Sequence, residues 1–293
     1  MKYSLRQLEI FLAIARQQNI SRAAETLHMS QSAASAALQN LEQAYNISLF
    51  NRIGKKLELN EVGKTLRSKA EILISHAHEF DQAMQGHTDI GHLKVGASFT
   101  IGNHLAVTYL ARYLNKHPEA QVDINVANSS AIAAQVLNFE VDIGMIEGQV
   151  NHKDLALIPW RDDSLVVFCS PEHPLAKKKN LSEKDILQAR WILRETESGA
   201  RQTFNRALAE LLPMLDIYLE FKHNEAIKKA VEAGLGIGCL SEIVLQNNFK
   251  SGELVPLKLP KRDMKRTFYF ALPKNRYRTA AIEEWMAECC SGV

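Results

Sequence analysis

Short side chains that can form hydrogen bonds alternate with alanine between residues 31 and 40. On a helix, the apolar residues Ala34 and Leu38 share one face and leave the polar residues on the other. That other face consists of Gln31, Ser32, Ala33, Ser35, Ala36, Gln39 and Asn40. A glutamine amide can donate to and accept from adenine, serine can reach base edges or phosphates, and an alanine methyl group can pack on thymine. The pattern indicates a helix that reads DNA, and the alternative is an ordinary surface helix.

Two short helical patterns, separated by a turn at residues 28–30, would position this polar face. Ala23 and Ala24 are small enough to let two helices cross closely. The apolar seam between the helices consists of Leu27, Met29, Ala34, Leu38 and Leu41. Ser21 and Ser30 each precede a helical run, and both are predicted N-caps. The pattern predicts a helix-turn-helix, although a two-helix corner of a larger domain has the same signature.

The segment 49–60 predicts a basic β-hairpin with its turn at Gly54. Arg52, Lys55 and Lys56 lie near the tip of this hairpin. Cations at that place can contact phosphates or enter an adjacent minor groove. The alternative is a hairpin that is simply exposed to solvent.

Residues 1–60 resemble the winged helix-turn-helix of LysR-type transcriptional regulators. The resemblance rests on Leu5-Arg6-Gln7-Leu8-Glu9-Ile10-Phe11, Ala23-Ala24, Ser30-Gln31-Ser32-Ala33, Leu41-Glu42 and Leu49-Phe50-Asn51-Arg52, in the family's order and spacing. It implies binding to double-stranded promoter DNA, assembly as a homodimer and a homotetramer, and contact with RNA polymerase. The chain has Ala36, Ala37 and Gln39 where relatives often carry basic residues. Base recognition is therefore expected from Gln31, Ser32, Ala36 and Gln39, with positive charge from the hairpin and Arg22.

An apolar stripe follows Asn60, which is a predicted N-cap for a long connecting helix over residues 61–88. The stripe consists of Val62, Leu66, Ala70, Leu73, Ala77, Phe80 and Met84. Such near-heptad spacing predicts pairing with the same helix of a second copy. A dimer would place two recognition helices in successive major grooves about 34 Å apart. The alternative is that the stripe packs against the rest of the chain.

Composition narrows the classes of protein without choosing one. A formal charge of +2 over 293 residues is too small for an indiscriminate nucleic-acid coat. We find neither a signal peptide nor an apolar run long enough to span a bilayer, so a cytoplasmic location is expected. No catalytic or metal-binding motif stands out, so neither an enzyme nor a metal site is predicted.

The four cysteines, Cys169, Cys239, Cys289 and Cys290, lack the spacing of a disulfide framework or a zinc site. Reduced thiols are therefore expected. A redox-sensing regulator is an alternative, but the redox cysteines of such family members lie in a loop where this chain has Ser198 and Ala200.

From about residue 91 the pattern alternates between strands and helices. Strands are predicted at 93–97, 122–127, 141–146 and 165–169, and helices at 103–115, 131–139, 200–211, 225–233 and 241–249. This alternation predicts an α/β domain with a mainly parallel sheet. The glycines of segment 233–238 follow a helix, whereas the dinucleotide fingerprint follows a strand, so they predict a tight turn.

The resemblance implies three parts: a winged helix-turn-helix at 1–60, the connecting helix, and an effector-binding domain at 91–293. It further implies that this domain has two lobes, like a periplasmic binding protein. Lobe one would span about 91–162 and 267–293, and lobe two about 163–266. The chain would cross between them near Asp162-Asp163 and return near Thr267. A solute-binding protein without DNA function is the alternative for this domain alone.

Polar residues at three junctions between a strand end and a helix start are candidates for effector binding, because helix N-termini attract anions. Family members bind effectors with hydroxyl residues at the positions of Ser98 and Thr100. The full expected set is Ser98, Thr100, Asn128, Ser129, Glu147, Ser198, Arg201, Asn224 and Glu225. Hydroxyls and one arginine favour a small anion, a sulfur oxyanion or a small carboxylate, and segments 141–148 and 191–195 resemble family members tied to sulfur and anion metabolism. The carboxylates could instead select an amine, and the serines and asparagine could simply cap helices.

Overall fold

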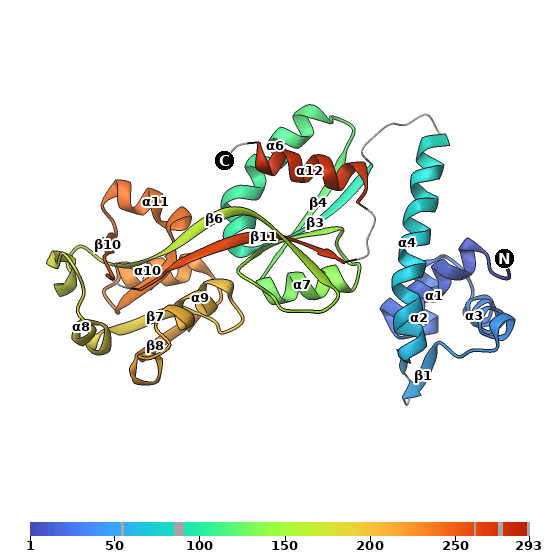
Figure 1. Ribbon diagram of the computed structural model, residues 1–293, viewed down its shortest axis with the longest axis horizontal. Helices are drawn as coiled ribbons and strands as arrows, with labels where there is room; N and C mark the ends of the chain where they lie inside the picture. The colour runs from blue at the N-terminus through green and yellow to red at the C-terminus, as the bar shows by residue number, and fades with distance from the viewer. Residues whose placement is uncertain (54–55, 85–90, 261, 275–277, 292–293) are drawn as a thin grey trace. The chain divides into compact units, whose positions relative to one another are not determined.

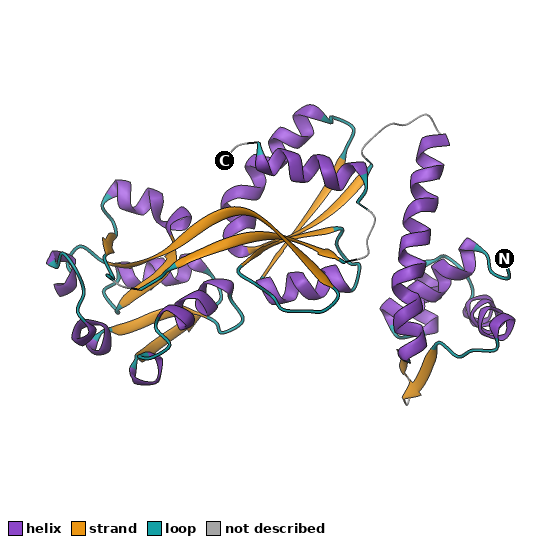
Figure 2. Ribbon diagram, in the orientation of Figure 1, coloured by secondary structure: helices purple, strands orange, loops and turns teal. Residues whose placement is uncertain are grey.

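The computed structural model describes residues 1–53, 56–84, 91–260, 262–274 and 278–291. Gly54 and Lys55 of the predicted hairpin tip, and positions 85–88 of the predicted connecting helix, lie outside these residues. The chain divides into an N-terminal unit, 1–89 with 275–279, and a C-terminal unit, 90–274 with 280–293. Each unit is described by itself (Figures 1 and 2). Among the helices in the described ranges, none is long and apolar enough to cross a membrane.

The N-terminal unit is a winged helix-turn-helix followed by a long helix. Its elements are α1 (Leu5–Gln17), α2 (Ile20–Thr26), α3 (Gln31–Tyr45), β1 (Phe50–Ile53), β2 (Lys56–Leu59) and α4 (Glu61–Met84). Strands β1 and β2 pair antiparallel, as the hairpin prediction required. The seam is also confirmed, because Ala23, Ala24, Ala34, Leu38 and Leu41 are buried in one core with α1.

Two of the three N-caps predicted from the sequence are present in the structure. Ser30 accepts a hydrogen bond from the Ala33 amide at 3.2 Å, and Asn60 accepts one from the Gly63 amide at 2.8 Å. The prediction for Ser21 is wrong, because α2 begins at Ile20 and its N-cap is Asn19. Asn19 has an extended backbone and accepts from the Arg22 amide at 3.1 Å, which leaves Ser21 inside the first turn.

The apolar stripe of α4 divides between two environments. Ala70 is buried, and Leu66 packs beside it against the helix-turn-helix core. Val62, Leu73, Phe80 and Met84 are exposed instead. The alternative of internal packing therefore holds for Leu66 and Ala70, and the second half of α4 keeps an apolar face open.

The described strands of the C-terminal unit form one sheet of nine strands, in the order β4-β3-β5-β11-β6-β9-β7-β8, with β10 paired to β6. The strands are β3 (His92–Ser98), β4 (Gln121–Ala127), β5 (Ile143–Glu147), β6 (Leu155–Cys169), β7 (Arg190–Arg194), β8 (Asp216–Phe221), β9 (Ile237–Ser241), β10 (Val255–Leu257) and β11 (Lys265–Pro273). Strands β3 to β5 are parallel neighbours in lobe one, as are β7 to β9 in lobe two. The long strands β6 and β11 are antiparallel and join the two halves (Figure 1). The sheet is parallel within each lobe, as predicted, but antiparallel along its centre.

Helices cover both faces of each lobe. They are α5 (Phe99–Ile101), α6 (Val107–Lys116), α7 (Ser129–Leu137), α8 (Glu183–Gln188), α9 (Gly199–Ala207), α10 (Asn224–Glu232), α11 (Glu242–Ser251) and α12 (Ala280–Cys290). A π-helical turn, Gly102–Ala106, links α5 to α6, so the predicted helix 103–115 is divided. Helices α6 and α12 pack on one core of lobe one, and α7 packs on the other.

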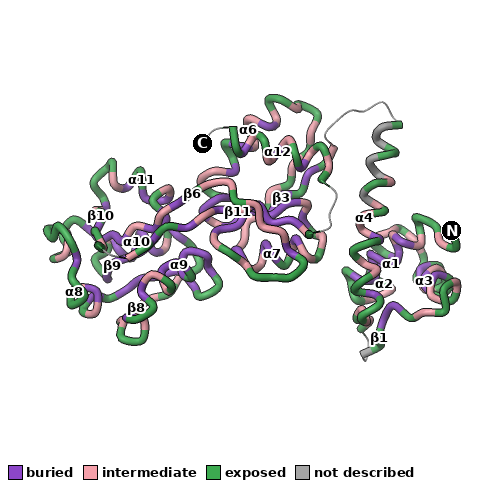
Figure 3. Tube along the Cα trace, viewed as in Figure 1, coloured by how far each residue is buried: buried purple, intermediate pink, exposed green. Residues whose placement is uncertain are grey.

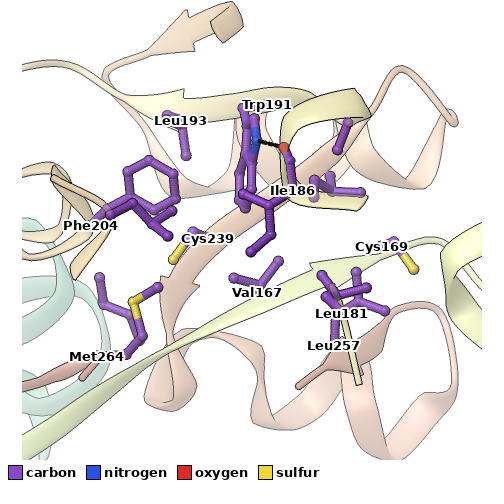
Figure 4. Close-up of a cluster of buried hydrophobic side chains, with 14 of the residues drawn as sticks. Val167, Cys169, Leu181, Ile186, Trp191, Leu193, Phe204, Cys239, Leu257 and Met264 are labelled. Atoms are coloured by element: carbon purple, nitrogen blue, oxygen red, sulfur yellow. Dashed lines mark hydrogen bonds between the residues drawn. The ribbon is translucent and has the colours of Figure 1, made fainter. Parts of the chain in front are cut away.

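The core of lobe two is built around Trp191 (Figure 4). Its indole packs edge-on to Phe204, with ring centroids 4.9 Å apart, and donates a hydrogen bond to the Ile186 carbonyl at 3.0 Å. Cys169 and Cys239 are buried in the same cluster. Burial raises the pKa of the Cys169 thiol to about 11 and that of Cys239 to about 12. These two thiols are therefore protonated at neutral pH and shielded, which is unfavourable for redox sensing.

Candidate functional site

The predicted DNA-reading face of α3 is open to solvent (Figure 3). The exposed members are Gln31, Ser32, Ala33, Ala36, Gln39 and Asn40, and Ser35 is half-buried. The Ser32 hydroxyl lies 3.1 Å from that of Ser30, so the N-cap also orients one of these side chains. Arg22, Arg52 and Lys56 are exposed as well. The helix-turn-helix and hairpin thus present both hydrogen-bonding groups and cations.

A buried ion network lies where β5 of lobe one meets the long strands. Glu147, at the end of β5, is 3% exposed. Its Oε1 accepts hydrogen bonds from the Ser98 hydroxyl at 2.8 Å and from the Thr100 amide at 2.9 Å. Its Oε2 accepts from Nη1 of Arg266 at 2.6 Å. The donors expected to hold a ligand at Ser98 and Thr100 therefore hold a carboxylate of the chain.

Arg266 connects this carboxylate to a second one. Its Nε donates to Asp163 at 2.7 Å, and the other oxygen of Asp163 accepts from the Ser241 hydroxyl at 2.7 Å. Arg266 comes from β11, Asp163 from β6 and Ser241 from β9, so the network includes both long strands and an inner strand of lobe two. The side chains of Arg266 and Asp163 are each 1% exposed.

The environment keeps Glu147 and Arg266 ionised. Burial acts to raise the pKa of Glu147, but the attraction of Arg266 and the hydrogen bonds from Ser98 and Thr100 outweigh it, and the pKa falls below its usual value. Burial likewise acts to lower the pKa of Arg266, but its two carboxylate partners raise it above the usual value. A buried pair of this kind persists because each charge has a partner, and removing one partner leaves the other uncompensated.

Lobe two places a second buried arginine against lobe one. Two nitrogens of Arg194 bind Glu195, at 2.9 and 3.0 Å, and Nη1 donates to the Asn224 side chain at 2.8 Å. Its guanidinium lies 5.0 Å from the ring centroid of Phe99, which also packs edge-on to His223. Phe99 belongs to lobe one, so it contacts two residues of lobe two.

Gly199 of lobe two lies directly against the backbone of Glu147 in lobe one. A Cβ atom at this position would lie 2.2 Å from the backbone carbonyl oxygen of Glu147, where 3.4 Å is ordinary contact. Only glycine therefore fits at the start of α9 in this arrangement. The neighbouring Ser198 caps α9 by accepting from the Ala200 amide at 3.2 Å.

Two buried donors at this junction have no hydrogen-bond partner among the described residues: Nη2 of Arg266 and Nδ2 of Asn224. A buried unpaired N–H group costs about 1–3 kcal/mol, so such groups in a folded protein need an explanation. Arg266 also lines a cavity of about 970 Å³. Gly148 and Gln149 of lobe one and Gly199 and Gln202 of lobe two line it as well. Asn224 does not line this cavity, whereas Arg266 does, and an unpaired N–H group on a cavity-lining residue is suited to an acceptor, which an anion supplies.

The remaining predicted effector residues are distributed around this network. Ser129 lies in it, because its hydroxyl is 3.1 Å from the Glu147 carbonyl oxygen. Asn128 caps α7 through the Ala131 amide at 2.8 Å. Arg201 is not an available cation, since Nη1 binds the Arg194 carbonyl and Glu220. Glu225 is mostly exposed and pairs with Lys228 at 2.6 Å.

Five buried polar residues of this site escaped sequence reasoning: Asp163, Arg194, Glu195, Ser241 and Arg266. A signal existed for Arg266. It lies two and four residues before Phe268 and Phe270, so a strand places it on the same apolar face. An arginine on a buried face requires an acidic partner, and Asp162-Asp163, just before the predicted strand 165–169, were available candidates.

A helix-turn-helix joined to a two-lobed domain with a polar junction defines a class, the ligand-responsive DNA-binding regulators. Residues 5–64 match the family model described as bacterial regulatory helix-turn-helix protein, lysR family, and residues 86–291 match the LysR substrate binding domain. The chain therefore belongs to the LysR-type transcriptional regulators, as its resemblance implied.

The chain is also similar to individual family members. It is 36% identical over 289 residues to the uncharacterized HTH-type transcriptional regulator YeiE of Escherichia coli K12, covering 99% of this chain and 98% of that protein. A full-length OxyR variant from Pseudomonas aeruginosa has the same fold, with a TM-score of 0.76, 21% identity, and coverage of 99% of this chain and 95% of that one. The regulatory domain of CcmR from Synechocystis PCC6803, solved in complex with 2-PG, has a TM-score of 0.64 and 26% identity, and covers 69% of this chain and 96% of that chain.

Proposed function

We propose that this regulator reads a promoter dyad through α3 and anchors itself through the hairpin. Gln31, Ser32, Ala33, Ser35, Ala36 and Gln39 would meet the major groove, and Arg22, Arg52, Lys55 and Lys56 would meet phosphates or the minor groove. The exposed half of the α4 stripe supports a homodimer, and family membership supports a tetramer that contacts RNA polymerase in the cytoplasm.

Substitution of a base-reading residue and substitution of a phosphate-contacting residue should weaken DNA binding in different ways. Gln31→Ala or Gln39→Ala should cost about 1–3 kcal/mol at the cognate site and relax base preference locally. Lys56→Ala should weaken binding to all sequences alike and reduce the salt slope by about one. Lys153→Ala, which removes an exposed cation from the C-terminal unit, is the matched control and should leave the slope unchanged. Unaltered base preference in both glutamine variants would remove them from the reading surface.

We further propose that a small anion, such as a sulfur oxyanion or a small carboxylate, binds at the lobe junction and controls DNA binding by closing the lobes. The observation that carries this proposal is the unpaired Nη2 of Arg266, a residue that lines the cavity. Asn224, Ser198 and the N-terminus of α9 would add donors. The ligand-bound CcmR domain supports the general idea that domains of this fold hold small molecules.

Calorimetry on the full chain tests this ligand class. Sulfate, phosphate, acetate and glycolate form one panel, and small primary amines form the other. We expect an anion to bind, and Asn224→Ala to weaken it about tenfold, in line with the loss of one charge-assisted hydrogen bond. Tight binding of an amine with no anion bound would favour the other candidate, in which Glu147 is the counter-ion of a cationic ligand.

A further inference from the structure

The buried network around Glu147 carries an excess of negative charge. Glu147 and Asp163 share one guanidinium, that of Arg266. The other buried arginine beside Glu147, Arg194, is already paired with Glu195. A bare anion arriving here would therefore meet two carboxylates and no unpaired cation among these residues.

Groups on the other elements packed against Glu147 do not change this balance. Burial and Lys228 lower the pKa of the half-buried His104, on the π-helical turn, so this histidine is neutral at neutral pH. Lys228 itself binds Glu225 at 2.6 Å and Asn248 at 3.2 Å. Glu147 remains ionised, so it can accept hydrogen bonds but cannot donate one.

The open acceptor position on Glu147 and the open donor on Arg266 belong to the same ion pair. Oε2 accepts one hydrogen bond among the described residues, from Nη1, although a carboxylate oxygen has lone pairs for two. Nη1 and Nη2 are bonded to the same carbon, so a ligand oxygen that accepts from Nη2 comes close to Oε2. Two acceptor oxygens at that place repel each other unless a hydrogen lies between them.

We propose that Glu147 makes this junction selective for oxyanions that carry an O–H group, whose oxygens accept from Arg266 and whose hydrogen is donated to Glu147. This inference rests on the proposed anion effector and narrows its class. Hydrogen phosphate-like anions and hydroxy acids fit, and fully deprotonated anions do not. A site built around a hydrogen-bonding ligand group rejects an analogue without it, because its own polar atom stays unpaired.

Phosphate and sulfate form the decisive pair, because they are tetrahedral and similar in size. At neutral pH phosphate keeps at least one hydrogen and sulfate keeps none. One hydrogen bond to a charged group predicts that phosphate binds about tenfold to a hundredfold tighter. A second comparison sets glycolate, which has an alcohol O–H group, against acetate, which has none. It shows whether an alcohol O–H group serves as well as the acidic O–H group of hydrogen phosphate.

The experiment is calorimetric titration of the full chain at pH 7 with each of the four anions. Glu147→Gln should reduce the preference for phosphate over sulfate to less than threefold, because an amide can donate to a bare oxygen. Glu119→Gln removes an equivalent charge from an exposed site of lobe one and should leave the preference unchanged. Circular dichroism confirms folding, and wild-type binding of sulfate as tight as that of phosphate overturns the inference even if Glu147→Gln unfolds.

The outcomes separate this inference from the proposal beneath it. A preference for phosphate over sulfate, or for glycolate over acetate, that depends on Glu147 supports the selectivity. Equal or tighter binding of sulfate and acetate overturns it and leaves the anion effector intact. No binding of any of the four anions rejects both.

Discussion

Replacing Gly199 with alanine tests whether the contact between the lobes is needed for effector binding. In the structure, the added Cβ would lie 2.2 Å from the Glu147 carbonyl oxygen, 3.0 Å from its carbonyl carbon and 2.9 Å from its Cβ. Ordinary contact begins at 3.4 Å. The obstructing atoms are mostly backbone, so no side chain can rotate away. The start of α9 would have to move from β5 by about 1 Å.

The magnitude follows from the cost of overpacking. Forcing an extra methyl group into a filled site costs about 1–3 kcal/mol when the surroundings cannot yield. If the effector binds the arrangement seen here, that cost appears as a loss of affinity of about fivefold to a hundredfold. The free protein avoids most of the cost by letting the lobes separate, so its unfolding temperature should change little.

Calorimetry with the anion that the wild-type chain binds best measures the effect. Gly234→Ala is the matched control, because it also adds a methyl group to lobe two but meets no atom within 4 Å. Gly234 has a φ of +76°, so alanine there should lower stability and leave affinity unchanged. Wild-type affinity in a folded Gly199→Ala variant would refute the argument that binding requires this contact.

Three other expectations concern separate parts of the molecule. Gly63→Ala should destabilise the N-terminal unit by about 1–3 kcal/mol, because its Cβ would lie 2.1 Å from the Leu49 carbonyl oxygen; urea unfolding measures this, and an unchanged midpoint contradicts it. The pKa of Glu147 is lower in the folded chain than its usual value, so its stabilising contribution is present above about pH 4.5 and is lost as the pH falls. The unfolding temperature of the wild type should therefore drop faster than that of Glu147→Gln below this pH, and parallel curves would contradict the assignment. Phe80→Glu should weaken dimerisation at least tenfold, as sedimentation can show, because it places a charge on the open apolar face of α4; an unaffected dimer would place the interface elsewhere.

Local signals in the sequence were sufficient for most of the N-terminal unit. Ser30 and Asn60 cap helices because their own side chains reach backbone amides three residues ahead, and that depends on nearby residues alone. The N-cap prediction for Ser21 was wrong for a related reason. Asn19 can cap the same helix, and it is the residue with an extended backbone directly before α2. The division of the α4 stripe could not be predicted, because it depends on which turns of α4 lie against the helix-turn-helix core.

At the effector junction, local signals in the sequence were not sufficient. Ser98, Thr100, Ser129 and Glu147, which were all expected to bind the effector, lie together in the structure, because strand ends and helix starts gather at one edge of a parallel sheet. Their partners could not be inferred from nearby residues. Arg266 is 119 positions from Glu147 and 103 from Asp163, and only the pairing of β11 with β5 and β6 brings them together.

Glu147 is the point at which ligand chemistry and lobe position meet. Its side chain binds Ser98 and Thr100 in lobe one and Arg266 on a long strand, and its backbone carbonyl faces Gly199 of lobe two. A ligand that binds Arg266 or Glu147 therefore changes the hydrogen bonds of a residue already in contact with both halves. Because a ligand shifts an equilibrium only by its differential affinity for the two states, these shared contacts are where such a difference can arise. For this reason, substitutions at Glu147 should alter ligand preference and lobe closure together, whereas Gly199→Ala should alter closure alone.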